Sequence, residues 1–162
     1  MVDGLMAAWE HLTWIGHDSY LAVADTAVPA TKQFEALQAT TIEGWVIDGT
    51  KSGVPVVAAF TEADDNVPVE IRRDDEGSAM SLRLCWTTDV DDLDQSGEGA
   101  WHTVAELPLP NGSCVVWDPF HGKIENGAVV HLIPGDFAVE IFNTGADCLG
   151  LRISTKESTH GG

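Results

Sequence analysis

Two tight-turn dipeptides in the second half of the chain constrain the fold more than any other feature. Asn111-Gly112 separates the apolar runs WHTVAELPLP and SCVVWD, and Pro134-Gly135 separates AVVHLIP from FAVEIFN. Asn-Gly between two apolar runs is among the strongest short-range signals for a β-hairpin, because both residues accept the positive φ angles of the turn. The stretch from Trp101 to Phe142 is therefore predicted to form two β-hairpins laid end to end.

Most of the remaining chain has the pattern of short strands. Residues 9–24 predict two strands joined by a turn at Gly16–Ser19, whereas residues 31–41 are ambiguous between a short helix and an extended segment. Alternating apolar and polar residues at 67–72 and 81–87 indicate strands with one buried face. Further strands are expected at 41–49, 54–60 and 148–155.

The spacing of these strands indicates the fold class. Turn signals recur about every eight to twelve residues, which is typical of β-sandwiches and β-barrels. The chain has 162 residues, the size of one domain, and 44% of them are apolar, with six Trp and five Phe to fill a core. We therefore expect an all-β protein: a single antiparallel β-sandwich of about ten strands, in one domain over residues 1–162.

Negative charge is the strongest compositional feature. Acids outnumber bases 26 to 8, for a formal net charge of −18. Nucleic acid and anionic membrane surfaces attract basic proteins, so neither is expected as a partner. Residues 62–98 hold twelve acids and three bases, a net −9, mainly in three predicted connections at 62–66, 74–76 and 89–98. These connections could steer a basic protein partner, or the charge could serve solubility alone.

Cysteine usage and the absence of targeting signals predict a cytoplasmic protein. Cys85, Cys114 and Cys148 form no CxxC pair, and each lies in an apolar run. They are interpreted as small buried hydrophobes in a reducing compartment. The first residues, MVDGLMAAWEH, lack the basic start and long apolar core of a signal peptide, and no run reaches the length of a membrane span.

No motif predicts a metal centre or a cofactor. Residues 92–97 match four positions of an EF-hand loop, but Thr103 stands where the bidentate Glu should be. The six histidines show no zinc-binding spacing, and the paired histidines of a cupin are absent. We therefore expect no metal and no cofactor, with calcium binding by the acidic loop 89–98 as the alternative.

Catalytic signatures are also missing. The sequence contains no nucleophile elbow, phosphate loop or dinucleotide fingerprint, so we expect that the protein is not an enzyme. The enzymatic alternative requires a pocket with convergent polar groups, such as His102, Glu106 and His131 on neighbouring strands.

The loop WDPFHG at 117–122 offers the clearest aromatic anchor for a partner. Asp118 and Pro119 start a turn that places Phe120 near its tip, and loop aromatics anchor binding partners well. Alternatively, Trp117 and Phe120 fold back and plug one end of the sandwich, which is the interpretation that we favour.

Residues 100–153 hold a spaced pattern of a Trp, a Val, a Glu, a strand ending in Gly, a second strand, a Pro-Gly turn, an aromatic–valine strand and a final Gly. The positions are Trp101, Val104, Glu106, Gly112, Val115, Pro134-Gly135, Phe137, Val139 and Gly145. This pattern resembles one found in small bacterial β-sandwich proteins, several families of which have no assigned activity. Some members are similar to the competence protein that inhibits a nuclease, or to toxin-immunity proteins. The resemblance implies a β-sandwich, and it assigns no catalytic residues to this chain.

These observations favour a non-catalytic binding module for a basic enzyme such as a nuclease. Acidic loops could occupy its basic groove as a mimic of the polyanionic substrate. The alternatives are a small-ligand or calcium-binding β-sandwich and an enzyme with an unrecognised site. The residues expected at the partner interface are Asp74, Asp75, Asp91, Asp92 and Asp94, which supply charge, and Trp117 and Phe120, which supply an anchor.

Overall fold

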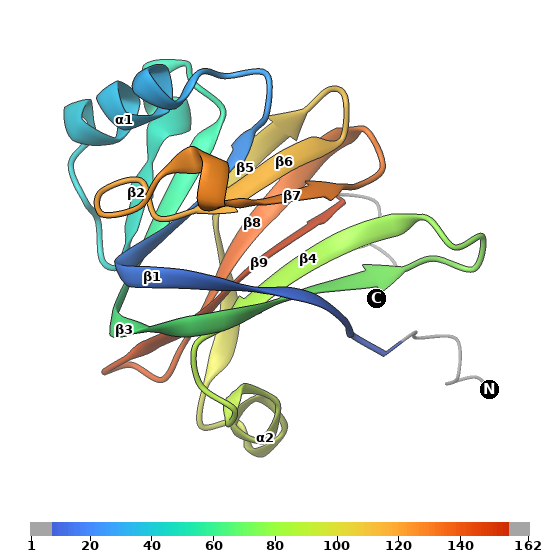
Figure 1. Ribbon diagram of the computed structural model, residues 1–162. Coiled ribbons are helices and arrows are strands. Elements are labelled where there is room, and N and C mark those ends of the chain that lie inside the picture. Colours follow the sequence, from blue (N-terminus) through green and yellow to red (C-terminus); the bar gives the residue numbers. More distant parts are fainter. Residues whose placement is uncertain (1–7, 156–162) are drawn as a thin grey trace.

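The computed structural model describes residues 8–155, apart from the side chains of residues 62–64. The described strands form one antiparallel sheet in the order β5-β8-β9-β4-β3-β1-β6-β7, with β2 paired to β3. The sheet curls until it is nearly closed into a barrel (Figure 1). The elements are β1 (Glu10–Asp25), α1 (Ala30–Ala39), β2 (Val46–Asp48), η2 (Gly49–Ser52), β3 (Val56–Arg73), β4 (Ala79–Cys85), α2 (Val90–Ser96), β5 (Ala100–Leu109), β6 (Ser113–Trp117), η3 (Ile124–Asn126), β7 (Ala128–His131), β8 (Gly135–Asn143) and β9 (Cys148–Thr155).

The all-β prediction is confirmed, but the two sheets of a sandwich are not seen among the described strands, which hydrogen-bond into one sheet. Both predicted hairpins are wrong in their pairing. β5 pairs with β8 and not with β6, and β7 pairs with β6 and not with β8. Pro110 has no N–H, so it cannot form the doubly bonded pair with Ser113 that a two-residue hairpin needs. Asn111-Gly112 is instead a corner between strands that lie far apart in the sheet.

β1 and β3 are two long paired strands, although the sequence predicts a break in each. The turn predicted at Gly16–Ser19 and the connection predicted at 62–66 lie opposite each other in this pair. Residues 61–63 face Ser19, whose φ of 71° marks a local irregularity. The predicted breaks therefore coincide with one bulge-like irregularity in the pairing, which ends neither strand.

His17 lies at this bulge and is only 6% exposed. Its Nδ1 lies 2.8 Å from the backbone carbonyl oxygen of Asp65, and its Nε2 lies 2.7 Å from the hydroxyl of Thr61. Because a carbonyl can only accept, Nδ1 carries the proton and Nε2 accepts from the hydroxyl in the neutral ring. Both ring nitrogens are thus used to hold the two strands together at their irregular point.

The barrel interior is an apolar core. The alternation predicted at 67–72 is confirmed, because Val67, Val69 and Ile71 are at most 2% exposed and point into this core. Inward residues of β4, β8 and β9, such as Leu84, meet them there. Burial of these side chains is the main favourable term that closes the sheet on itself.

Two helices cover separate patches on the outside of the sheet (Figure 1). The ambiguous segment 31–41 forms α1, which buries Leu37 against outward residues of β1, β3 and β6. Its N-cap is Pro29, and Thr31 lies inside the helix. The predicted connection 89–98 contains α2, which packs Val90 against Phe142 of β8.

Among residues 8–155, no helix is both long and apolar enough to cross a membrane. Residues 1–7, on which the signal-peptide prediction partly rests, lie outside the described part of the chain.

Candidate functional site

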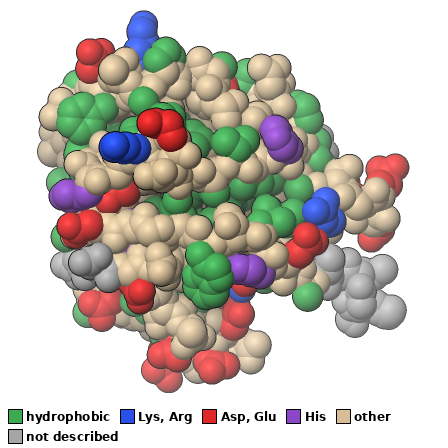
Figure 2. Space-filling view, in the orientation of Figure 1, with side chains coloured by type: hydrophobic (Ala, Val, Ile, Leu, Met, Phe, Trp, Pro, Cys, Tyr) green, Lys and Arg blue, Asp and Glu red, His purple; other side chains and the backbone are tan. Residues whose placement is uncertain are grey.

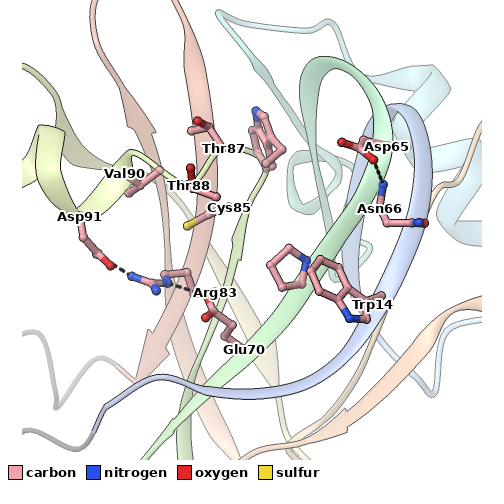
Figure 3. A pocket seen from close by; sticks show the side chains of 12 residues that line it. Trp14, Asp65, Asn66, Glu70, Arg83, Cys85, Thr87, Thr88, Val90 and Asp91 are labelled. Atoms are coloured by element: carbon pink, nitrogen blue, oxygen red, sulfur yellow. Dashed lines mark hydrogen bonds and ion pairs between the residues drawn. The ribbon is translucent and has the colours of Figure 1, made fainter.

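A cavity of about 400 Å³ opens on the outer face of the sheet beside α2. Figure 3 shows Trp14 of β1 on one wall and Asp91 of α2 on the opposite wall, with Arg83 and Glu70 between them. Pro68, Cys85, Trp86 and Val90 contribute apolar lining, and Asp65, Asn66, Thr87 and Thr88 contribute polar lining.

Trp14 is the most exposed aromatic residue among the large hydrophobic side chains of the described chain, at 60%. Its neighbour Ile15 is buried in the barrel, so the alternation of the strand turns Trp14 outward. The ring of His11 packs against it with 5.0 Å between ring centroids. An exposed tryptophan at the wall of a cavity offers a ligand a large face that loses little conformational entropy on binding.

Arg83 ties α2 to the sheet. Its Nε donates to Glu70 Oε1 at 3.0 Å, and its Nη1 donates to Asp91 Oδ1 at 2.8 Å. Burial acts to lower the pKa of Arg83, but neighbouring acidic groups, with Glu70 and Asp91 among them, outweigh burial and raise it. Among the described lining residues, Arg83 is the only base, and it is already engaged by two of the three carboxylates there, Asp65 being the third.

Cys85 also lines the cavity, and its buried thiol is poorly suited to act as a nucleophile. Burial raises the pKa of the Cys85 thiol to about 12, although the guanidinium of Arg83 acts in the opposite direction. A thiol with such a pKa is protonated at neutral pH, and only the thiolate attacks or binds metals well.

The predicted acidic residues fall into two separate groups. Asp91, Asp92 and Asp94 are exposed on α2, whereas Asp74 and Asp75 lie in the turn between β3 and β4. The seven residues of β4 separate the two groups, a distance of about 20 Å at the rise of a strand. Figure 2 accordingly shows acidic side chains over α2 and, apart from them, at the β3–β4 tip.

Asp74 has a structural role within its turn. Its Oδ1 accepts hydrogen bonds from the backbone N–H groups of Glu76 and Ser78, each at 2.9 Å. This pattern fixes an Asx-type turn and engages one of the carboxylate oxygens. Asp75 makes no such contact among the described residues.

Trp117 and Phe120 fold back onto the barrel, as the plugging alternative expects. Trp117 is 5% exposed, and its Nε1–H donates to Oε1 of Gln33 in α1 at 2.8 Å. Phe120 packs against Tyr20 and Phe34, with centroids 4.6 and 5.5 Å apart. The side chain of Trp117 is thus part of the core beneath α1.

The residues of the enzymatic alternative do not meet. His102 and Glu106 lie on β5, and His131 lies on β7. His102 lines one cavity and His131 lines another.

The acidic loop likewise has no calcium-loop geometry, because residues 92–96 are helical. Among the described residues, no group of three or more His, Cys, Asp or Glu side chains is placed to hold a metal ion.

Sequence reasoning missed Trp14 and Arg83 as parts of one site. The alternation of SLRLCWT does place Arg83 on the outer face of its strand. No sequence signal links it to Trp14, because that link depends on the bulged pairing of β1 with β3.

Comparison with known proteins gives no match: no family model fits the chain, and neither a curated protein nor a solved structure is similar to it.

Proposed function

We propose that this protein is a non-catalytic acidic module that binds a basic protein, and that α2 and the Trp14 cavity form the contact surface. One observation carries the proposal: the exposed ring of Trp14 shares a cavity with three carboxylates, and the single base there is already paired. A lysine or arginine side chain of a partner could contact the face of Trp14 and the carboxylate of Asp65.

The charge of the whole chain supports the same kind of partner. A net charge of −18 attracts a basic surface over several ångströms and speeds its encounter. Asp92 and Asp94 project from α2 beside the cavity, and Asp75 would add steering charge at a second, distant position. An inhibitor or immunity protein for a basic enzyme, acting in the cytoplasm, fits this chemistry. The described cysteines are all free and buried, which supports a reducing compartment.

Two pairs of substitutions test the surface. Asp92→Asn with Asp94→Asn removes two charges from α2, whereas Glu125→Gln with Asp136→Asn removes two exposed charges elsewhere. The partner is captured from the host at low ionic strength, identified, and its affinity for each purified variant is measured. The α2 pair should weaken binding about tenfold, and the control pair should weaken it much less. Capture of no basic protein, or equal weakening by both pairs, would contradict the proposal.

The size of the cavity favours a second candidate function, the binding of a small organic cation. A volume of about 400 Å³ falls within the range of small-molecule sites. Tetramethylammonium is a suitable probe, with calcium chloride as the test of the metal alternative. A ligand at a hundred times its dissociation constant should stabilise the fold by about 2.7 kcal/mol in thermal melting. An unchanged melting temperature with both probes would remove this candidate.

A further inference from the structure

Three of the four arginines lie on neighbouring strands of the outer sheet face. The register aligns Arg72 of β3 with Ser81 of β4, and Ser81 with Ser154 of β9. Two residues further along β4, on the same face, the register aligns Arg83 with Arg152 of β9. Side chains that are directly opposite on adjacent strands have Cβ atoms about 5 Å apart, so these guanidinium groups and hydroxyls share one patch.

Arg72 is the member of this patch without a counter-ion. Arg83 pairs with Glu70 and Asp91, and Arg152 pairs with Glu140 at 2.8 Å. Within residues 8–155, Arg72 forms no ion pair, and its Nε is buried with no hydrogen-bond partner. An unsatisfied buried donor costs about 1–3 kcal/mol, and more when it is charged. The chain contains 26 acids, so an arginine left without one is unexpected.

The surroundings of Arg72 hold it in place without neutralising it. The ring of Trp9 packs on Arg72 and on Arg83, with 4.3 and 4.6 Å from each guanidinium carbon to the ring centroid. Burial lowers the pKa of Arg72, and the charges of Arg152 and Arg83 lower it further, while the charge of Asp91 acts in the opposite direction and does not cancel them. A bound anion would relieve both the buried donor and this repulsion.

Further donors remain in the same patch. Arg83 uses Nε and Nη1 for its carboxylates, and Arg152 uses Nε and Nη2. One terminal nitrogen of each therefore has no partner within the described residues. Ser81, which is 4% exposed, donates its O–H to Ser154 Oγ at 3.0 Å, so the O–H of Ser154 is left to donate.

We propose that Arg72, with the open N–H groups of Arg83 and Arg152 and the hydroxyl of Ser154, binds a phosphate group. Planar guanidinium forks match the oxygens of a tetrahedral oxyanion, and several converging donors favour a dianion over a single carboxylate. The group could belong to inorganic phosphate or to a small phosphate monoester. Arg83 is common to this site and to the Trp14 cavity, but the central residue of the site, Arg72, does not line that cavity. Phosphate binding can therefore be tested without the basic partner.

The arginine Nε–H resonances give a direct test, because the chain has only four arginines. Proton–nitrogen correlation spectra are recorded at constant ionic strength while inorganic phosphate is raised to about 20 mM, which covers millimolar affinities. The Arg72 resonance, assigned with the Arg72→Lys variant, should move downfield and saturate. The Arg73 resonance should stay in place, since Arg73 is exposed and paired with Glu10. No saturable movement, or an equal drift of all four resonances, would overturn the proposal.

Substitutions test the role of each residue in phosphate binding, and other anions test which group the site prefers. Ser154→Ala is expected to weaken phosphate binding about threefold, and Arg72→Gln to abolish it. Arg73→Gln, which removes the same charge from the next residue, should leave the affinity unchanged. Tighter binding of phosphoserine than of inorganic phosphate would identify a monoester as the ligand, and the reverse order would identify free phosphate. Acetate binding as tightly as phosphate would overturn the assignment of a phosphate group.

Discussion

The backbone N–H of Leu132 donates to the carbonyl oxygen of Gly112 at 2.8 Å, which ties together two turns of the second half of the chain. Gly112 closes the corner between β5 and β6, and Leu132 begins the connection from β7 to β8. Each connection joins strands that do not pair with each other. Their contact therefore helps to hold the two edges of the curled sheet near each other.

Gly112→Ala should destabilise the fold strongly. Gly112 has φ of +73°, and a Cβ there would lie 2.1 Å from the carbonyl oxygen of Leu132. Backbone strain and the steric clash together should lower the free energy of unfolding by about 3 kcal/mol in urea denaturation. Gly77→Ala is the matched control, because Gly77 has φ of +87° with no atom near the added carbon. It should cost only about 1 kcal/mol, and equal losses would show that the contact with Leu132 is unimportant.

The sequence locates most of these strands but not their partners. The runs before and after Asn111-Gly112 are strands, and the turn is real, since Gly112 N–H bonds to the Leu109 carbonyl at 2.9 Å. The turn residues alone predict hairpin pairing. Pro110 is the local signal against it, because a proline cannot donate to the ladder beside the turn. The curl of the sheet, which gives β5 and β6 other neighbours, depends on contacts between distant residues that no local pattern records.

Trp117→Phe should lower the free energy of unfolding by about 2–3 kcal/mol. The substitution removes the indole N–H that satisfies Gln33, which is fully buried, and it leaves a small void. Thermal or urea denaturation would measure the loss. Trp14→Phe provides the control, since the same change at a 60% exposed side chain should have little effect. A stable Trp117→Phe variant would argue against a role for Trp117 as a structural plug.

The ion pairs of Arg83 should contribute more to stability than the pair of Lys51 with Glu43. Arg83→Met leaves Glu70, which is 19% exposed, without its counter-charge, and should cost about 2 kcal/mol. Lys51→Met breaks a pair of similar length between side chains that are 55% and 74% exposed. Water screens that pair, so no measurable change in the free energy of unfolding is expected. Comparable losses in urea denaturation would contradict this ranking.

The candidate site was predictable only in its charge. The acids of 89–98 were identified from composition, and three of them do project from α2. The helix itself was not predicted, because its seven residues contain only two apolar side chains, Val90 and Leu93. The arginine patch follows from alternation within each strand, but the contacts of Arg72 with Trp9 require the pairing of β1 with β3. Sites of this kind depend on which strands pair with each other, and the periodicity within one strand shows which face is buried but not which strand is its partner.

Alkaline pH should unfold the protein partly through its buried thiols. Burial raises the pKa of Cys114 from 9 to about 12, and the charge of Asp25 adds to this shift. Below pH 9 the thiol keeps its proton in both the folded and the unfolded state, so the contribution of the buried neutral thiol to the free energy of unfolding is fully present. It is lost as pH rises towards 12, because only the unfolded state releases the proton in that range. The slope is about 1.4 kcal/mol per pH unit for each such thiol. Cys114→Ala should reduce the slope above pH 9 relative to the wild-type chain, and identical slopes would contradict the burial of this thiol.

Trp14→Ala separates binding from folding at the candidate site. The side chain is 60% exposed, so its removal should change the free energy of unfolding by less than about 0.5 kcal/mol. If a basic partner uses the cavity, the same substitution should weaken its binding at least tenfold, because aromatic anchors at the centre of an interface carry much of the affinity. Val129→Ala, at a residue of β7 that is 56% exposed, controls for the loss of apolar surface away from α2. Titration calorimetry with the captured partner measures both variants, and unchanged affinity of Trp14→Ala would place the interface elsewhere on the acidic surface.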